Sequence, residues 1–242
     1  MKILKTLLMI IGIPIVGFSM TMVILIIARC FVEARYMPAS SMEPTMHVHD
    51  TVLVEKVKTM LHRPYVRGEI IVFYPPPLIT GGQDLSNDAP HVMGRLTGLH
   101  CFPNDPAFIK RIIGLPGDRI VVRAGQGVFV NNQWLLEDYV KEQPAYSLHT
   151  LADMTGSDIN NKPIAFETDP AKKDLEIVVP KDCLFVLGDN RNNSEDSHTW
   201  GFLPQNRIIG RTMVLMRNME HFKYPLSEPK KEPIRNPLDP EA

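Results

Sequence analysis

The chain contains little cysteine, and its three cysteines do not form a metal-binding pattern. Cys30, Cys101 and Cys183 are widely separated, and no Cys-x-x-Cys pair occurs in the 242 residues. This spacing argues against a structural zinc site. In an oxidising compartment Cys101 and Cys183 could pair, but two buried free thiols fit the sequence equally well.

The chain also lacks an excess of charge of either sign. It has 26 Lys and Arg against 27 Asp and Glu, with a formal net charge of −1. A nucleic-acid partner normally requires a basic patch or stripe, so we expect none. No long helical pattern appears after the N-terminal region, and the 21 prolines favour a loop-rich, mainly β chain.

One stretch lacks charge altogether. Residues 7–28 form a run of 22 residues without a charged side chain, preceded by Lys2 and Lys5 and followed by Arg29. A helix of that length spans the roughly 30 Å hydrocarbon core of a bilayer. A cleaved secretory signal is the alternative, but its apolar region is normally about 7–15 residues and ends at an Ala-x-Ala-like site. We therefore expect a retained single-pass membrane anchor, with residues 1–6 in the cytoplasm and the remaining chain on the outer (trans) side.

After this anchor, short runs typical of β-strands alternate with turns. The predicted strands are residues 51–56, 69–74, 108–113, 119–123, 127–130, 133–135, 176–179, 183–187 and 208–216. No further helix of convincing length is expected. Residues 75–106 and 142–174 are predicted as loops, and the proline-rich tail 225–242 as disordered.

Three segments carry polar residues that this pattern does not explain. Residues 37–46 form a proline-bounded turn with two adjacent hydroxyls, Ser40 and Ser41. Lys110 lies within an apolar strand, where a charged ammonium is costly to bury. Residues 188–197, Gly-Asp-Asn-Arg-Asn-Asn-Ser-Glu-Asp-Ser, form a dense polar loop after a hydrophobic strand.

A serine nucleophile needs a base, and a neutral lysine can supply one. The lysine pKa of about 10.4 must fall to about 7 for half of the side chains to be neutral at pH 7, at a cost of about 4 kcal/mol. Burial in an apolar environment produces shifts of that size. Strand alternation predicts that Phe108 and Ile112 share the face of Lys110 and desolvate its amine.

The three segments resemble the sequence boxes of the type I signal peptidases. The family pattern Pro-x-x-Ser-Met-x-Pro-Thr matches residues 38–45, and Lys-Arg-x-x-Gly-x-Pro-Gly-Asp matches residues 110–118. Gly-Asp-Asn-Arg-x-Asn-Ser-x-Asp-Ser, followed by Trp-Gly, matches residues 188–201. The boxes occur in the family's order behind the apolar run, so the resemblance covers residues from about 7 to 216.

This resemblance implies a mainly β fold with a small barrel-like catalytic core and no metal or other cofactor. It implies a membrane-bound serine endopeptidase that cleaves signal peptides from exported preproteins through an acyl-enzyme, with Ser41 as nucleophile and Lys110 as base. It assigns Ser194 to orienting the base and Asp196 to supporting the active-site loop. Small substrate side chains would enter pockets lined by Met37, Pro38 and Ile109.

The resemblance also implies a division of the chain after the anchor. Residues 36–123 and 183–217 would form the catalytic core. Residues 124–182 would form a cap region inserted between its two parts.

Three positions depart from the family pattern. Ala39 stands where many relatives carry a serine whose hydroxyl can help to stabilise the oxyanion, so this site would rely on the Ser41 amide. Asn192 stands where the pattern often has Asp, and His198 where Arg is common. A contact between His198 and Asp196 would replace an Arg–Asp pair and would titrate near neutral pH.

Alternative interpretations of the site use other residues. Ser40 is the rival nucleophile, and Ser41 with His198 and Asp196 would make a Ser-His-Asp triad. His47 and His49 alternate on one strand face, but no third metal ligand is evident.

Two other kinds of protein also fit part of the pattern. A self-cleaving repressor-type Ser/Lys protease would carry a DNA-binding domain ahead of the protease, where this chain has an apolar helix. An inactive relative that only binds preproteins would not need both Ser41 and Lys110, which are present.

Overall fold

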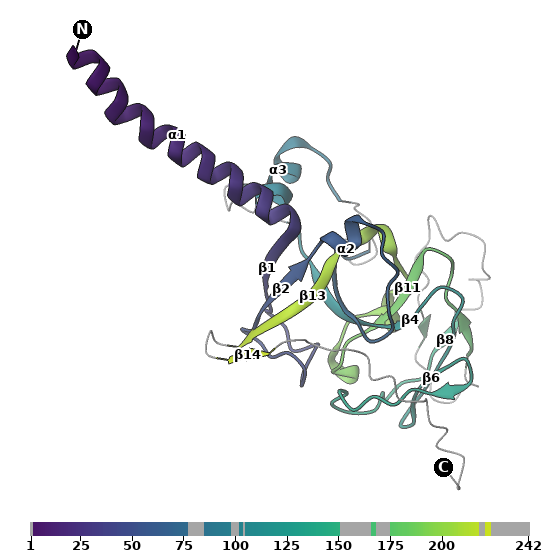
Figure 1. The fold of residues 1–242 in the computed structure, drawn as a ribbon. Helices are drawn as coiled ribbons and strands as arrows, with labels where there is room; N and C mark the ends of the chain where they lie inside the picture. Colours follow the sequence, from purple (N-terminus) through teal and green to yellow (C-terminus); the bar gives the residue numbers. More distant parts are fainter. Residues whose placement is uncertain are drawn as a thin grey trace.

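The N-terminal part of the chain is one long helix that leads directly into a β-rich domain. The computed structural model describes residues 2–76, 85–97, 102–103, 105–150, 166–167, 175–217 and 221–223. Helix α1 (Lys2–Phe31) is followed without a linker by strand β1 (Val32–Tyr36). The helix projects away from the rest of the molecule (Figure 1). Among the described residues, α1 is the one helix long and apolar enough to cross a membrane.

The largest element of the domain is an eight-stranded sheet in the order β1-β2-β13-β3-β4-β11-β12, with β14 paired to β13. All of its pairings are antiparallel. Its strands after β1 are β2 (Thr51–Glu55), β3 (Ile70–Phe73), β4 (Phe108–Gly114), β11 (Cys183–Leu187), β12 (Leu203–Pro204), β13 (Ile208–Arg217) and β14 (His221–Lys223).

A second, four-stranded sheet has the order β10-β5-β6-β7. Its strands are β5 (Arg119–Arg123), β6 (Gly127–Val130), β7 (Gln133–Trp134) and β10 (Ile177–Val178), and a separate pair joins β8 (His149–Thr150) to β9 (Phe166–Glu167). Figure 1 shows β6 and β8 on the side of the domain away from α1. The described part of the chain also contains the helices α2 (Val57–Met60), α3 (Ala89–Thr97) and α4 (Ser197–Trp200), and the 3₁₀ helices η1 (Arg191–Asn193) and η2 (Gln205–Arg207).

The mainly β prediction is confirmed, and the strand predictions agree with the structure within two residues at either end. The boundary predicted between residues 123 and 124 falls inside the smaller sheet, because β5 pairs with β6. The predicted disordered tail 225–242 lies outside the described residues.

The prediction missed the strands β1, β8, β9, β12 and β14 and all of the described helices after α1. Helix α3 lies within the predicted loop 75–106, where the Asp88 carboxylate accepts a hydrogen bond from the His91 amide (3.1 Å) and Pro90 occupies the first turn. Strand β1 was missed because its charged residues obscure the alternation. Glu33 is buried there and forms ion pairs with Arg35 on the same strand and with Lys56, which the pairing of β1 with β2 brings close.

Candidate active site

Ser41 lies in the turn that follows β1. The turn is closed by hydrogen bonds from the Glu43 amide to the Ser40 carbonyl (3.1 Å) and from the Met46 amide to the Met42 carbonyl (2.9 Å). The Met42 and Met46 side chains are fully buried in a hydrophobic cluster with residues of β2, β3 and β4. Because these two side chains hold the turn against the core, Ser41 is presented at the surface with its side chain partly exposed.

Lys110 lies on β4, an interior strand between β3 and β11. Its side chain is only 4% exposed, and its Nζ lies 5.6 Å from the centre of the Phe108 ring, so Phe108 shares its face as predicted. Nζ donates a hydrogen bond of 2.8 Å to the Ser41 Oγ. Burial lowers the pKa of Lys110, and the negative charges of Asp196, Glu195 and Asp189 only partly oppose this. The structure therefore brings a serine hydroxyl to a lysine that loses its proton more readily than a free lysine.

The polar loop after β11 holds the serine turn in place. Asn190 donates from its backbone amide to the Ser41 carbonyl and from its side chain to the Ser40 carbonyl, both at 3.1 Å. The Asn193 side chain donates to the Ser40 Oγ at 3.0 Å. The hydroxyl of the rival nucleophile Ser40 thus contacts an amide, whereas that of Ser41 contacts an amine.

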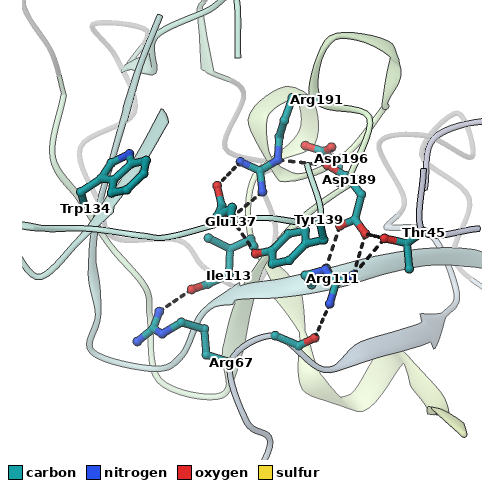
Figure 2. Close-up of polar contacts among 12 residues, drawn as sticks. Thr45, Arg67, Arg111, Ile113, Trp134, Glu137, Tyr139, Asp189, Arg191 and Asp196 are labelled. Atoms are coloured by element: carbon teal, nitrogen blue, oxygen red, sulfur yellow. Dashed lines mark hydrogen bonds and ion pairs between the residues drawn. The ribbon is translucent and has the colours of Figure 1, made fainter. Parts of the chain in front are cut away.

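A buried ion pair joins the same loop to the lysine strand. Arg111 donates to both carboxylate oxygens of Asp189, at 2.8 and 2.6 Å, and both side chains are at most 2% exposed. The Thr45 hydroxyl also donates to Asp189 (Figure 2). Asp189 therefore connects the serine turn, the lysine strand and the loop.

A second buried pair ties the loop to the segment that follows β7. Arg191 donates to the two carboxylate oxygens of Glu137 at 2.7 and 2.6 Å and to the Gly188 carbonyl at 3.1 Å. Figure 2 shows the Tyr139 ring between this pair and the Arg111–Asp189 pair. Its hydroxyl donates to Glu137, and the Arg111 guanidinium lies 3.8 Å from its ring centre.

Glu137 and Tyr139 were missed by the sequence analysis. The only signal in the sequence was a short run, Glu-Asp-Tyr, without hydrophobic periodicity. Nothing in it indicated which arginine Glu137 would meet 54 residues later in the chain.

Asp196 is fully buried and caps the N-terminus of α4. One carboxylate oxygen accepts from the Gly188 amide (2.8 Å), and the other contacts the His198 Nδ1 (2.7 Å), so the predicted His198–Asp196 contact is present. Burial alone would raise the pKa of Asp196, but the hydrogen bond and charge of His198, together with the Gly188 amide and Lys110, lower it.

The His198 ring is engaged away from Ser41. Its second nitrogen contacts the Thr199 hydroxyl (3.2 Å), and its face stacks on Tyr146 with ring centres 4.1 Å apart. Since both nitrogens have other partners, this geometry does not favour a Ser-His-Asp triad.

Ser194 occupies a tight position beside the serine turn. Its Oγ is buried and has no hydrogen-bond partner among the described residues. A methyl group built on Gly188 would lie 2.2 Å from this Oγ and 2.5 Å from the Ser41 carbonyl oxygen, so only glycine allows this approach. A contact between Ser194 and Lys110 stays a prediction.

A cavity of about 280 Å³ opens beside the Ser41–Lys110 pair. The three residues predicted to bind substrate, Met37, Pro38 and Ile109, all line it together with Ser41. Ala39 also lines the cavity and offers no hydroxyl to it. The remaining lining residues are Tyr36, Ser40, Ala107, Phe108, Asn193 and Glu195.

The other candidate features do not join this site. Within the described ranges, no group of three or more His, Cys, Asp and Glu residues could hold a metal ion. His49 contacts the Tyr36 hydroxyl through Nδ1. Cys183 is a buried free thiol, and its possible partner Cys101 lies outside the described residues.

A serine hydroxyl held against a buried lysine amine in a mainly β domain is the arrangement of the Ser/Lys class of serine hydrolases. A sequence model described as "Signal peptidase, peptidase S26" matches residues 10–216. The chain therefore belongs to this family of signal peptidases, which confirms the resemblance, and its activity is the cleavage of signal peptides from preproteins.

Individual relatives agree with this assignment. Probable signal peptidase I-2 of Synechocystis sp. is 41% identical over 196 residues, which cover 80% of this chain and 68% of that protein. Signal peptidase I of Leptolyngbya laminosa is 37% identical over 204 residues, covering 84% and 77%. Thylakoidal processing peptidase 1, chloroplastic, of Arabidopsis thaliana is 31% identical over 197 residues, covering 81% of this chain and 45% of that protein.

Proposed function

We propose that Ser41 is the nucleophile and Lys110 the general base with which this peptidase cleaves signal peptides. The observation that carries the proposal is the 2.8 Å hydrogen bond between the Lys110 amine and the Ser41 hydroxyl, with the amine buried. A lysine acts as a base only when it is neutral, and desolvation in an apolar strand favours the neutral form.

In the proposed reaction the Ser41 Oγ attacks the scissile carbonyl carbon while its proton passes to the Lys110 Nζ. The tetrahedral intermediate collapses, the C–N bond breaks, and Nζ returns the proton to the leaving amine. The acyl-enzyme is then attacked by a water that gives a proton to Nζ. The bond between the acyl carbon and Oγ breaks, Nζ returns that proton to Oγ, and the signal peptide is released with Ser41 and neutral Lys110 restored. The Ser41 backbone amide is the proposed oxyanion donor.

Three further roles belong to the same proposal. Ser194 would orient the base: its buried hydroxyl is not engaged by another partner among the described residues, so it is available to turn toward the Lys110 amine. Asp196 would support the loop through the Gly188 amide. The apolar cavity would admit small substrate side chains against Met37, Pro38 and Ile109.

We place α1 in a lipid bilayer, with residues 1–6 in the cytoplasm and the catalytic domain on the trans side. The apolar side chains of the described helix from Ile13 to Leu25 are exposed and without protein cover. Lys2 and Lys5 precede the helix, which favours a cytoplasmic N-terminus. Beside the C-terminal end of α1, where the Lys56 amide bonds to the Phe31 carbonyl (2.9 Å), residues 56–68 carry four Lys or Arg and no acidic residue. Lys56 pairs with Glu33 and Arg67 with Asp118, so the exposed Lys58 and Arg63 are the cations that would face anionic headgroups.

We also propose the division into an anchor (7–28), a catalytic core (36–123 and 183–217) and an inserted cap (124–182). The sheet topology supports it, because every strand of the larger sheet lies outside residues 124–182, whereas β6, β7 and β10 of the smaller sheet lie inside this range. Strand β5, at the end of the first core part, would be shared with the sheet of the cap.

The placement in the membrane can be tested with the full chain expressed in a bacterium. We expect added protease to digest the catalytic domain in spheroplasts, whose outer face is exposed, and to spare it in inverted vesicles until detergent is added. A co-expressed preprotein should be cut to a mature form whose N-terminus identifies the cleavage site. Digestion in intact inverted vesicles would show the opposite orientation, whether or not the preprotein is processed.

The pH dependence of cleavage should follow the proton of Lys110. Because burial lowers its pKa below the ordinary value of 10.5, kcat/KM should rise with pH and reach half of its maximum below pH 10.5. The measurement is a pH profile on a peptide without ionisable side chains, at pH values where circular dichroism shows the folded chain. A profile that is flat or that falls with pH over this range would contradict a lysine base.

A further inference from the structure

Glu195 places a carboxylate at the cavity beside Ser41. It stands between Ser194 and Asp196 in the catalytic loop, its side chain is exposed, and it lines the same cavity as Met37, Pro38 and Ile109. The family pattern leaves this position unspecified, and the roles proposed above do not use it.

The charge of Glu195 is not neutralised by a neighbour. The other acidic residues of this region have close partners: Asp189 pairs with Arg111, and Asp196 contacts His198. Among the described residues, no ion pair or hydrogen bond joins a partner to the Glu195 carboxylate. The other residues that line the cavity are all uncharged. The cavity thus has uncharged walls, partly apolar and partly polar, and one carboxylate that is exposed to solvent.

We propose that Glu195 forms a subsite for a cationic side chain of the bound peptide. A preprotein with Lys or Arg at the position that meets this subsite would be cleaved faster than one with a neutral residue, and one with Asp or Glu more slowly. The inference rests on the proposed function, since it requires that the peptide binds in the cavity beside Ser41.

The expected size of the effect follows from the exposure of the carboxylate. An exposed ion pair is worth little, typically a few-fold in affinity, and salt screens it. Attraction speeds the cleavage of a Lys peptide and repulsion slows that of a Glu peptide. The ratio of their kcat/KM values is therefore the most sensitive measure of the subsite. We expect a preference for Lys over Glu of about fivefold or more at low salt, falling as salt is raised to about 1 M.

The test uses the full chain in detergent and peptides that carry one cleavage site. Each position from −3 to +2 is replaced in turn by Lys, Gln or Glu, and kcat/KM is measured on the alkaline plateau. In Glu195→Gln, the peptides with Lys and Glu at the position that meets the subsite should be cleaved at similar rates, and the change should appear mainly in KM. The peptide with Gln at that position should be cleaved nearly as fast as by the unaltered enzyme. Glu176→Gln is the matched control, because it removes an exposed carboxylate that pairs with Arg119 near the smaller sheet.

A second readout separates this role from an effect on the base. The negative groups that act on the Lys110 amine are Asp196, Glu195 and Asp189, so Glu195→Gln should also move the pH profile of every peptide to lower pH by the same amount. If Glu195→Gln moves the pH profile but changes the Lys, Gln and Glu peptides by one common factor, the subsite does not exist. Equal Lys and Glu rates in the unaltered enzyme would also overturn it. If Ser41→Ala cleaved the peptides, the proposed function would fail instead.

Discussion

Ser41→Ala and Lys110→Met are each expected to lower kcat/KM for a preprotein by on the order of 10⁴-fold or more. The two side chains act as a unit, in which the hydroxyl is the nucleophile and the amine takes its proton, so the double variant should be hardly slower than either single variant. Both chains should stay folded. Alanine removes only a partly exposed hydroxyl, and methionine fills the lysine site without a buried amine. The measurements are cleavage kinetics and a urea unfolding curve for each variant.

Two control variants accompany this experiment. Ser40→Ala removes the neighbouring hydroxyl, which accepts from Asn193, and Lys181→Met removes an exposed lysine in the turn before β11. Both should keep most of the activity. An inactive Ser40→Ala beside an active Ser41→Ala would show that Ser40 is the nucleophile, and additive losses in the double variant would argue against a dyad.

Glu137→Ala should produce the largest loss of stability among single substitutions outside the site. The Arg191 side chain is completely buried and that of Glu137 is 2% exposed. The substitution therefore leaves the Arg191 guanidinium without its counter-ion in a place that water does not reach. Removing one partner of such a pair costs about 3–5 kcal/mol. With an m-value unchanged, this appears as a lower midpoint of urea unfolding for the full chain in detergent. Because Arg191 also donates to the Gly188 carbonyl, cleavage should weaken in the same variant.

The matched comparison is Glu176→Ala, which breaks the exposed pair with Arg119, whose side chains are 36% and 59% exposed. An exposed pair of this kind contributes about 0–1 kcal/mol. The double variant Glu137→Leu/Arg191→Met should recover much of the stability, because it removes the unpaired charge as well. Equal midpoints for Glu137→Ala and Glu176→Ala would show that the buried pair does not stabilise the fold.

The candidate site was predictable to the extent that its residues lie in short sequence segments. Ser41 follows from the box that contains it, and Lys110 from one basic residue in an apolar strand. The buried amine and the face shared with Phe108 both follow from strand alternation, which is a local property. His198 beside Asp196 was predictable for the same reason, since they are two positions apart.

The partners of the loop residues Asp189 and Arg191 could not be predicted from short sequence segments. Asp189 meets Arg111 across 78 positions, and Arg191 meets Glu137 across 54. Neither segment carries a pattern that selects one partner over another. Strand order decides the Asp189–Arg111 contact, because β4 and β11 become neighbours only when the sheet is complete. The Arg191–Glu137 contact requires in addition that the segment after β7 packs against the loop after β11.

By itself, the sequence of this signal peptidase determined the apolar helix, most of the strands and the two residues proposed for the chemistry. These depend on the order of side chains over fewer than about a dozen residues or on one long apolar run. Only the tertiary structure decided how the serine turn is held, that Ser194 is left without a partner among the described residues, and that Glu195 faces the cavity. The reason is that burial and charge pairing are properties of neighbours in space, and the folded sheet brings those neighbours from distant parts of the chain.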